Sequence, residues 1–253
     1  MTDEVRFRDD GGIRVVTLNR PHRHNAFTAD GYRTLAGLLA ESAADDDVRV
    51  VMLTGAGTGF CSGVDLAELA AAEGDLSEFD TTFHALLRTL TTFPKPLLAV
   101  VHGAAVGFGF TVLLHCDIVV VAQDARMCAP FAALGTAPEA GSSHLLPRLV
   151  GPQRAAELLL TGRWLTAEEA VQWGLATRVV TSGTALEEGL ALARSIAEHP
   201  PAAVAEAKRL LLRGRSDEIA AAITAEGRGA AALAGGSPNH LAGPRRILPL
   251  TPT

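Results

Sequence analysis

Cysteine and aromatic residues are scarce in this sequence. Its 253 residues include three cysteines, and aromatic residues make up 5% of the chain. Cys61, Cys116 and Cys128 are odd in number and lack CxxC spacing, so a disulfide scaffold is excluded and reduced thiols are expected. The composition, 48% hydrophobic and 20% charged, also excludes a disordered chain. We therefore predict a folded protein with a substantial core.

Basic residues are too few for general nucleic-acid binding. The chain has 22 Lys and Arg against 28 Asp and Glu, which gives a net charge of -6 at pH 7. A nucleic-acid binder would normally present a basic face. We expect no nucleic-acid partner, and an anionic ligand would need basic residues gathered locally.

Long uninterrupted apolar runs and clustered metal ligands are also lacking. The N-terminal residues are charged, and the longest apolar stretch, residues 96–116, is interrupted by glycines and histidines. We expect no membrane partner and a cytoplasmic location. The eight histidines are scattered apart from His22 and His24, which predicts no metal site.

The chain does contain an alternation of apolar strand and helix patterns. Asp9-Asp10-Gly11-Gly12 separates two short β-branched runs and predicts a hairpin. The near-continuous apolar run at residues 48–53 predicts a sheet covered on both faces. Strands are expected at residues 5–7, 13–18, 48–53, 97–101, 118–122 and 177–180.

Helical patterns alternate with these strands and dominate from residue 142 onward. The alternation predicts an α/β core at residues 1–195 and a helical C-terminal region at residues 196–253. A polar, mobile segment is expected at residues 72–80. Helices are expected at residues 29–42, 65–71, 82–90, 109–115, 142–149, 152–160, 166–173, 185–198, 202–213 and 217–234.

Two glycine-rich loops share one design, in which a buried strand delivers glycines and a helix then begins. The first covers residues 55–63 and the second residues 103–109. Backbone N–H groups at helix starts are unpaired, so two converging loops would form an oxyanion hole. Alternatively, the glycines only permit tight turns.

Other chemistries fit the first loop poorly. In a dinucleotide-binding fingerprint the third glycine would fall at Phe60, and the acidic residue that binds ribose is missing about twenty residues later. Ser62 lies in FCSGV and not in the Gly-x-Ser-x-Gly turn of a nucleophilic serine.

Glu139 is notable for its context. It is a lone carboxylate in the small-residue segment LGTAPEAGSS, residues 134–143, at the start of an apolar helix. Such an acid could carry the chemistry of a site, or it could only interact with the helix dipole.

Three segments resemble the crotonase, or enoyl-CoA hydratase/isomerase, superfamily: FCSGVDL at 60–66, HGAAVGFGFTVLLHCD at 102–117 and APFAALGTAPEAGSSHLLPRLVG at 129–151. The resemblance extends from Asn19-Arg20-Pro21 to Ala170-x-x-x-Gly174-Leu175. It implies a spiral of ββα units with a helical C-terminal region that covers the site. It also implies a homotrimer or dimer of trimers, with an acyl-CoA thioester as substrate and no cofactor apart from the coenzyme A of that substrate.

The resemblance also implies roles for individual residues. Glu139 would be the catalytic base, and the backbone N–H groups of Val64 and Phe108 would form the oxyanion hole. Phe108, Phe131 and Leu134 would exclude water and raise the pKa of the Glu139 carboxyl. Arg20 and Arg23 are candidates near the phosphates or ordinary surface arginines. Contacts to the substrate and coenzyme A are expected from Arg23, Ala26, Cys61, Ser62, Gly63, Asp65, Leu66, Gly107, Thr111 and Phe131.

Within the superfamily the chain most resembles the peroxisomal-type Δ3,Δ2-enoyl-CoA isomerases and their bacterial relatives. Hydratases use two glutamates, and their places here hold Thr111 and Phe131. The isomerase base lies in a Pro-Glu-Gly or Pro-Asp-Ala-Gly turn, which residues 138–141 match. We expect an isomerase. The alternatives are a hydratase that uses Glu139 alone, a ring-expanding isomerase of the epoxyphenylacetyl-CoA type, and a non-catalytic CoA-binding protein.

The end of the chain departs from the family. The usual terminal helix is replaced by the proline-interrupted residues 235–253, so the same lid is not expected there and acyl-chain preference is unreadable.

Overall fold

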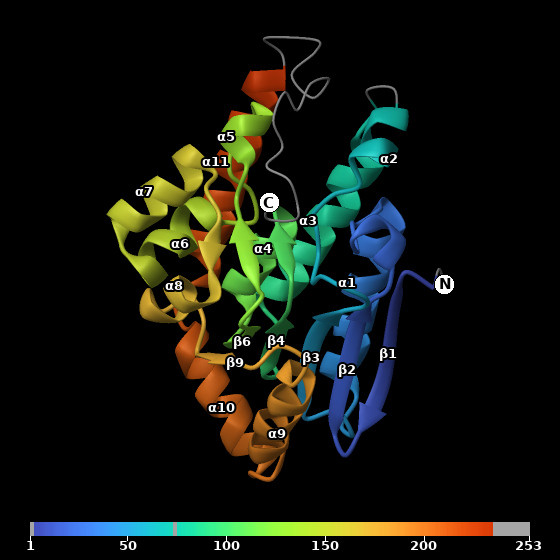
Figure 1. Cartoon of the computed structure of the whole chain (residues 1–253). Helices are drawn as coiled ribbons and strands as arrows, with labels where there is room; N and C mark the ends of the chain where they lie inside the picture. Colours follow the sequence, from blue (N-terminus) through green and yellow to red (C-terminus); the bar gives the residue numbers. More distant parts are fainter. Residues whose placement is uncertain (1–2, 73–74, 235–253) are drawn as a thin grey trace.

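A six-stranded sheet forms the centre of the computed structural model, which describes residues 3–72 and 75–234 (Figure 1). β1 and β2 are antiparallel, and every later pair of neighbours is parallel. The strands lie in the order β1 (Val5–Asp10), β2 (Ile13–Leu18), β3 (Val50–Gly55), β4 (Leu97–Val101), β6 (Ile118–Ala122) and β9 (Arg178–Val180). The expected α/β architecture and the hairpin at Gly11-Gly12 are confirmed.

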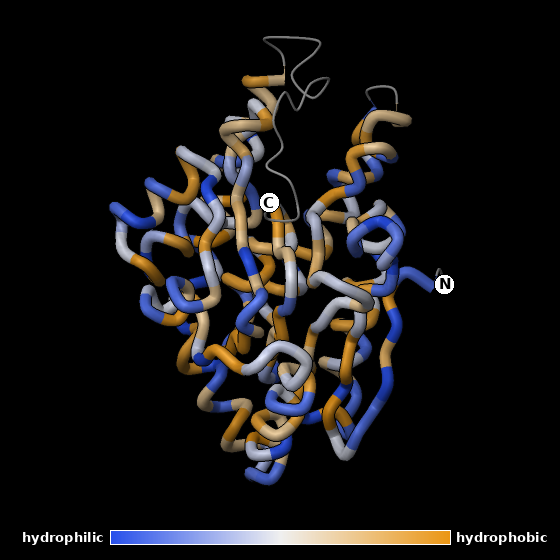
Figure 2. The backbone as a smooth tube through the Cα atoms, in the orientation of Figure 1, coloured by the Kyte–Doolittle hydropathy of each residue, from blue (hydrophilic) through white to orange (hydrophobic). Residues whose placement is uncertain are grey.

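Helices cover both faces of this sheet, as the apolar strands predicted. Alternate residues of a strand face opposite sides. On β3, Val51 and Leu53 pack with α1 (Ala29–Ala44) and α3 (Ser77–Thr91), whereas Val50 and Met52 pack with α9 (Ala185–Ala197). Figure 2 shows hydrophilic residues along the edge strand β1 and apolar residues along the inner strands.

A second, small sheet was not expected from the sequence. It has three strands in the order β5 (Ala104–Val106), β7 (Arg126–Cys128) and β8 (Leu165–Thr166). The second glycine loop therefore contains a strand, which was wrongly expected to be only a loop. β5, β7 and β8 have only two or three residues and no alternating pattern, and their pairing depends on contacts from distant parts of the chain.

The expected mobile segment at residues 72–80 is wrong for its last four residues. α3 begins at Ser77, five residues before the expected start at 82. Its first turn is polar on the outside, but Phe79 is buried at 8% exposure. The segment was not predicted as helical because its composition is polar and Phe79 is the residue of this turn that packs in the core. α2 (Leu66–Ala71) precedes it and is capped by Asp65, which accepts from the N–H groups of Ala67 and Glu68.

The mainly helical second half is confirmed within about two residues at most ends. α11 packs against α6 and reaches α3 across the molecule (Figure 1). The boundary at residue 195 stays a prediction. The remaining helices are η1 (Pro21–Arg23), α4 (Phe108–Thr111), η2 (Val112–His115), α5 (Phe131–Leu134), α6 (Ser142–Val150), α7 (Pro152–Thr161), α8 (Ala167–Gln172), α10 (Pro201–Leu212) and α11 (Ser216–Ala234).

Within residues 3–72 and 75–234, no helix is both long enough and apolar enough to cross a membrane. The proline-interrupted tail at residues 235–253 lies outside the described residues, as do residues 73–74.

Candidate active site

A cavity of about 1170 Å³ lies between the two glycine loops, the segment from Pro130 to Ala140, α3 and α11. This volume is slightly above the usual range for small-molecule sites. The lining is mainly apolar, and the polar groups that face it come from elements far apart in the sequence.

The first glycine loop is held like a strand, so that one N–H group turns toward the cavity. Phe27 N–H donates to the Gly63 carbonyl at 2.7 Å, and Asp65 N–H donates to the Phe27 carbonyl at 2.8 Å. Successive N–H groups of an extended segment point to opposite sides. The Val64 N–H therefore points away from Phe27, and Val64 lines the cavity.

The second loop brings a helix start to the same place. Phe108 is the first residue of α4, so its N–H has no partner within that helix. The backbones of the two loops nearly touch: a methyl group at Gly63 would lie 3.3 Å from the Phe108 nitrogen and 2.9 Å from the Val106 oxygen. Gly63 also has a φ of +90°, which side chains rarely adopt. The arrangement can offer the Val64 and Phe108 N–H groups to one oxygen.

Glu139 lies in a sharp turn between α5 and α6 and faces the cavity. Ala140 and Gly141, the next two residues, have φ of +59° and +72°. The Ser142 N–H donates to the Glu139 carbonyl at 3.0 Å. His115 Nε2 lies 2.8 Å from the Ala140 carbonyl oxygen, and because a carbonyl only accepts, this nitrogen carries the proton.

The surroundings of Glu139 favour its neutral form. Burial raises the pKa of its carboxyl from 4.5 to about 8, and the negative charge of Glu226 adds to the increase. Phe108, Phe131 and Leu134, which were expected to exclude water, all line the cavity. A carboxyl with this pKa is suited to accept and return a proton near neutral pH.

An aromatic wall stands beside the second loop. Tyr32 of α1 lines the cavity, and its ring stacks on Phe27 with centroids 4.8 Å apart. Edge contacts join Tyr32 to Phe108 at 5.3 Å, and Phe83 of α3 to Phe108 at 5.2 Å. Sequence reasoning missed Tyr32, Phe83 and Glu226, because nothing in their local sequence separates them from core or surface positions.

The structure brings most of the expected site residues together, with two exceptions. Cys61 and Thr111 are 0% exposed and do not line the cavity. The Cys61 thiol instead donates to the Asn25 carbonyl at 3.2 Å. The expected residues that do line the cavity are Arg23, Ala26, Ser62, Gly63, Val64, Asp65, Leu66, Gly107, Phe108, Phe131 and Glu139.

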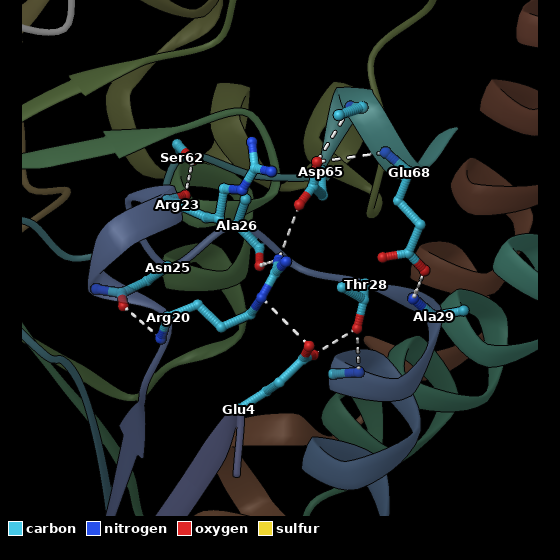
Figure 3. A network of polar contacts seen from close by, with 12 residues as sticks. Glu4, Arg20, Arg23, Asn25, Ala26, Thr28, Ala29, Ser62, Asp65 and Glu68 are labelled. Carbon is cyan, nitrogen blue, oxygen red and sulfur yellow. Dashed lines mark hydrogen bonds and ion pairs between the residues drawn. The ribbon is translucent and has the colours of Figure 1, made fainter. Parts of the chain in front are cut away.

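The two candidate phosphate ligands have different surroundings. Figure 3 shows Arg20 between the carboxylates of Glu4, at 3.2 Å, and Asp65, at 2.9 Å. Arg20 also donates to the Ala26 carbonyl at 2.7 Å, so its guanidinium is occupied by the protein. Arg23 is exposed at the cavity, and its guanidinium takes part in none of these contacts. Of the two, Arg23 is available to an anionic ligand.

A family model described as "Enoyl-CoA hydratase/isomerase" matches residues 8–233 of the chain. The chain belongs to the enoyl-CoA hydratase/isomerase family. Its fold agrees with that membership: the crystal structure of an enoyl-CoA hydratase/isomerase from Pseudoalteromonas atlantica T6c superposes with a TM-score of 0.89 at 33% identity, over 96% of this chain and 95% of that one.

Members of the family with different names are similar to the chain to nearly the same degree. The 1,2-epoxyphenylacetyl-CoA isomerase of Escherichia coli K12 is 39% identical over 75% of this chain and 74% of its own length. Enoyl-CoA delta isomerase 2 of Rattus norvegicus is 37% identical over 83% of this chain and 54% of its own. The 2,3-dehydroadipyl-CoA hydratase of E. coli K12 is 36% identical over 85% of this chain and 84% of its own length. Family membership therefore indicates an enzyme without separating isomerase from hydratase.

The described residues contain no group of three His, Cys, Asp or Glu side chains placed to hold a metal ion. The polar groups at the cavity include the Glu139 carboxyl, the loop N–H groups and Arg23.

Proposed function

We propose that this protein is an acyl-CoA double-bond isomerase that converts 3-enoyl-CoA to 2-enoyl-CoA thioesters. The observation that carries the proposal is the carboxyl of Glu139, which faces the cavity and has its pKa raised to about 8. Its carboxylate takes no hydrogen bond from the residues that the structure describes, whereas Asp65 and Glu226, which also line the cavity, accept several.

One base and two amide donors suffice for this reaction. The thioester oxygen would accept from the Val64 and Phe108 N–H groups, which stabilise the enolate more than the ground-state carbonyl. The Glu139 carboxylate removes a proton from C2, and the C3–C4 double bond moves to C2–C3 as C4 takes the same proton back. No redox partner or water is consumed.

The deciding experiment compares wild type with Glu139→Gln on 3-enoyl-CoA and 2-enoyl-CoA esters, with the products separated and identified. Glutamine keeps the shape but cannot accept the proton, so kcat should fall about 10³-fold. Asp80→Asn is the matched control, because Asp80 is an exposed carboxylate that also lines the cavity. Equal isomerisation by wild type and Glu139→Gln would exclude Glu139 as the base.

A second candidate is a ring-expanding isomerase of 1,2-epoxyphenylacetyl-CoA, favoured by the relative of that name at 39% identity. The same base and oxyanion hole would serve it, so the substrates must be compared directly. If turnover of the epoxide exceeds that of every 3-enoyl-CoA ester tested, this candidate replaces the first. Hydration of 2-enoyl-CoA without isomerisation would favour a hydratase, and CoA binding without turnover a non-catalytic protein.

A further inference from the structure

Glu226 is a buried carboxylate on the C-terminal helix whose partners belong to the turn that bears Glu139. It is 7% exposed. Its Oε2 accepts from the Gly141 N–H at 2.7 Å, and its Oε1 accepts from the Ser143 N–H at 2.8 Å and from the Ser143 hydroxyl at 2.6 Å. The two elements are more than eighty residues apart in the sequence.

We propose that Glu226 is a positioning residue for the Glu139 base, fixing the turn from the side of α11. The inference rests on the proposed function of Glu139 and assigns the C-terminal helix a part in it. Glu226 acts through its position and charge, since three donors from the turn hold its two oxygens in place.

The turn needs support from both sides. Ala140 and Gly141 both have positive φ, and for Ala140 this conformation is strained. His115 donates to the Ala140 carbonyl on one side of the turn. On the other side, Glu226 accepts from the N–H groups of Gly141 and Ser143. Without Glu226, two N–H groups at the start of α6 would lose their acceptor, and the turn could relax away from the cavity.

Glu226 is also the charged group that acts on Glu139. Burial raises the pKa of Tyr32 on α1 well above its ordinary value and that of Cys61 on the first loop to about 12, so both are neutral at pH 7. Burial lowers the pKa of His115 on η2 to about 4, which leaves it neutral too. The Glu226 charge disfavours a second negative charge on Glu139 and so adds to the rise of its pKa.

The helix that carries Glu226 also lines the cavity. Ile223, Gly227 and Ala230 of α11 face the ligand space one helical turn or less from Glu226. The same helix therefore contacts the bound ligand and holds the base, and its placement affects both.

The test is the pH dependence of kcat/KM for a 3-enoyl-CoA ester in Glu226→Gln. Removing the charge should lower the pKa of Glu139 and move the acidic limb to lower pH. Loosening the turn should reduce the plateau about tenfold, mainly in kcat. Ser143→Ala removes one hydrogen bond and keeps the charge, so its acidic limb should stay in place. Glu218→Gln is the matched control, since Glu218 lies on the same helix but pairs with His144 and Arg148 of α6 rather than with the Glu139 turn.

Two outcomes overturn the inference. One is a Glu226→Gln profile whose limb and plateau match wild type. The other is a loss that is equal at every pH and matches the loss of folded protein measured by circular dichroism, which would make Glu226 merely structural. The infrared titration of the Glu139 carboxyl, assigned by its absence in Glu139→Gln, tests the pKa displacement without turnover. It therefore remains decisive if wild type fails to isomerise and the proposed function is rejected.

Discussion

At the scale of single residues, the proposed chemistry depends on the protonation state of Glu139. Its pKa of about 8 means that the protonated form dominates at pH 7, although a base must be deprotonated to act. We predict that kcat/KM for isomerisation rises nearly tenfold per pH unit up to about pH 8 and then levels off. Steady-state rates from pH 5.5 to 9.5 measure this, and a flat profile across pH 6–8 would contradict it.

The raised pKa of Glu139 also affects the stability of the fold. The direction of the shift is opposite to that of a carboxylate in a salt bridge, so the stability changes with pH in the opposite direction. The folded value, about 8, lies above the ordinary 4.5, so the folded state binds more protons between those pH values. The contribution is fully present below about pH 4.5 and is lost as pH rises through about 8. Relative to wild type, Glu139→Gln should therefore gain thermal stability as pH is raised from 5 to 9, as followed by scanning calorimetry.

The sequence predicted the position of Glu139 and its apolar neighbours, but not Glu226 or Tyr32. The Pro-Glu-Ala-Gly motif and the two glycine loops are contiguous signals, and the structure places Val64, Phe108 and Glu139 at one cavity. Glu226 lies in a helix of mostly small residues and Tyr32 on the buried face of another, where both look ordinary. Their importance depends on contacts from distant parts of the chain, which no local pattern contains.

At the scale of elements, Asn25 orders the first glycine loop. It adopts a φ of +57°, and its amide donates to the carbonyls of Ala56 and Gly59, both at 2.8 Å, and of Phe60 at 3.2 Å. Its Oδ1 accepts from the Arg20 N–H at 2.9 Å (Figure 3). One side chain thus connects the start of η1 with the loop that leads to Val64.

Asn25→Asp should disrupt this loop without changing its volume. The carboxylate can still accept from Arg20, but it cannot donate, and it would face three carbonyl oxygens in a buried site. We predict a loss of about 3 kcal/mol in the free energy of unfolding, measured in urea. Asn19→Asp is the control, because Asn19 makes one side-chain bond, to the Asp3 carbonyl near the surface. Equal midpoints for the two variants would contradict the prediction.

The longer elements were predictable because their patterns repeat. β3 alternates between two cores, and Thr28 caps α1 by accepting from the Gly31 N–H at 2.9 Å. β8, with two residues, and the first turn of α3 gave no such repetition. The sequence did not indicate these short segments, because contacts with their neighbours stabilise them.

At the scale of the whole molecule, the C-terminal helix packs back against the candidate active site. α11 follows some eighty residues after the Glu139 turn, yet it packs on α6 (Figure 1). Its residues also line one side of the cavity. The helix therefore ties folding of the C-terminal region to assembly of the site. Glu226 connects α11 to the Glu139 turn by hydrogen bonds in addition to packing.

The expected homotrimer can be tested on α10, where Leu210 and Leu211 expose 52% and 70% of their surfaces in the single chain. Leu211→Asp should change the stability of one isolated chain by less than about 0.5 kcal/mol, because the side chain is already solvated. If a trimer buries Leu211, the same change places a charge in an apolar interface, and light scattering should show the mass falling from three chains to one. Leu186→Asp on α9, 42% exposed, is the matched control and should leave the mass unchanged. A wild-type mass of one chain would refute the trimer, whereas a trimeric Leu211→Asp variant would place the interface elsewhere and refute this use of α10.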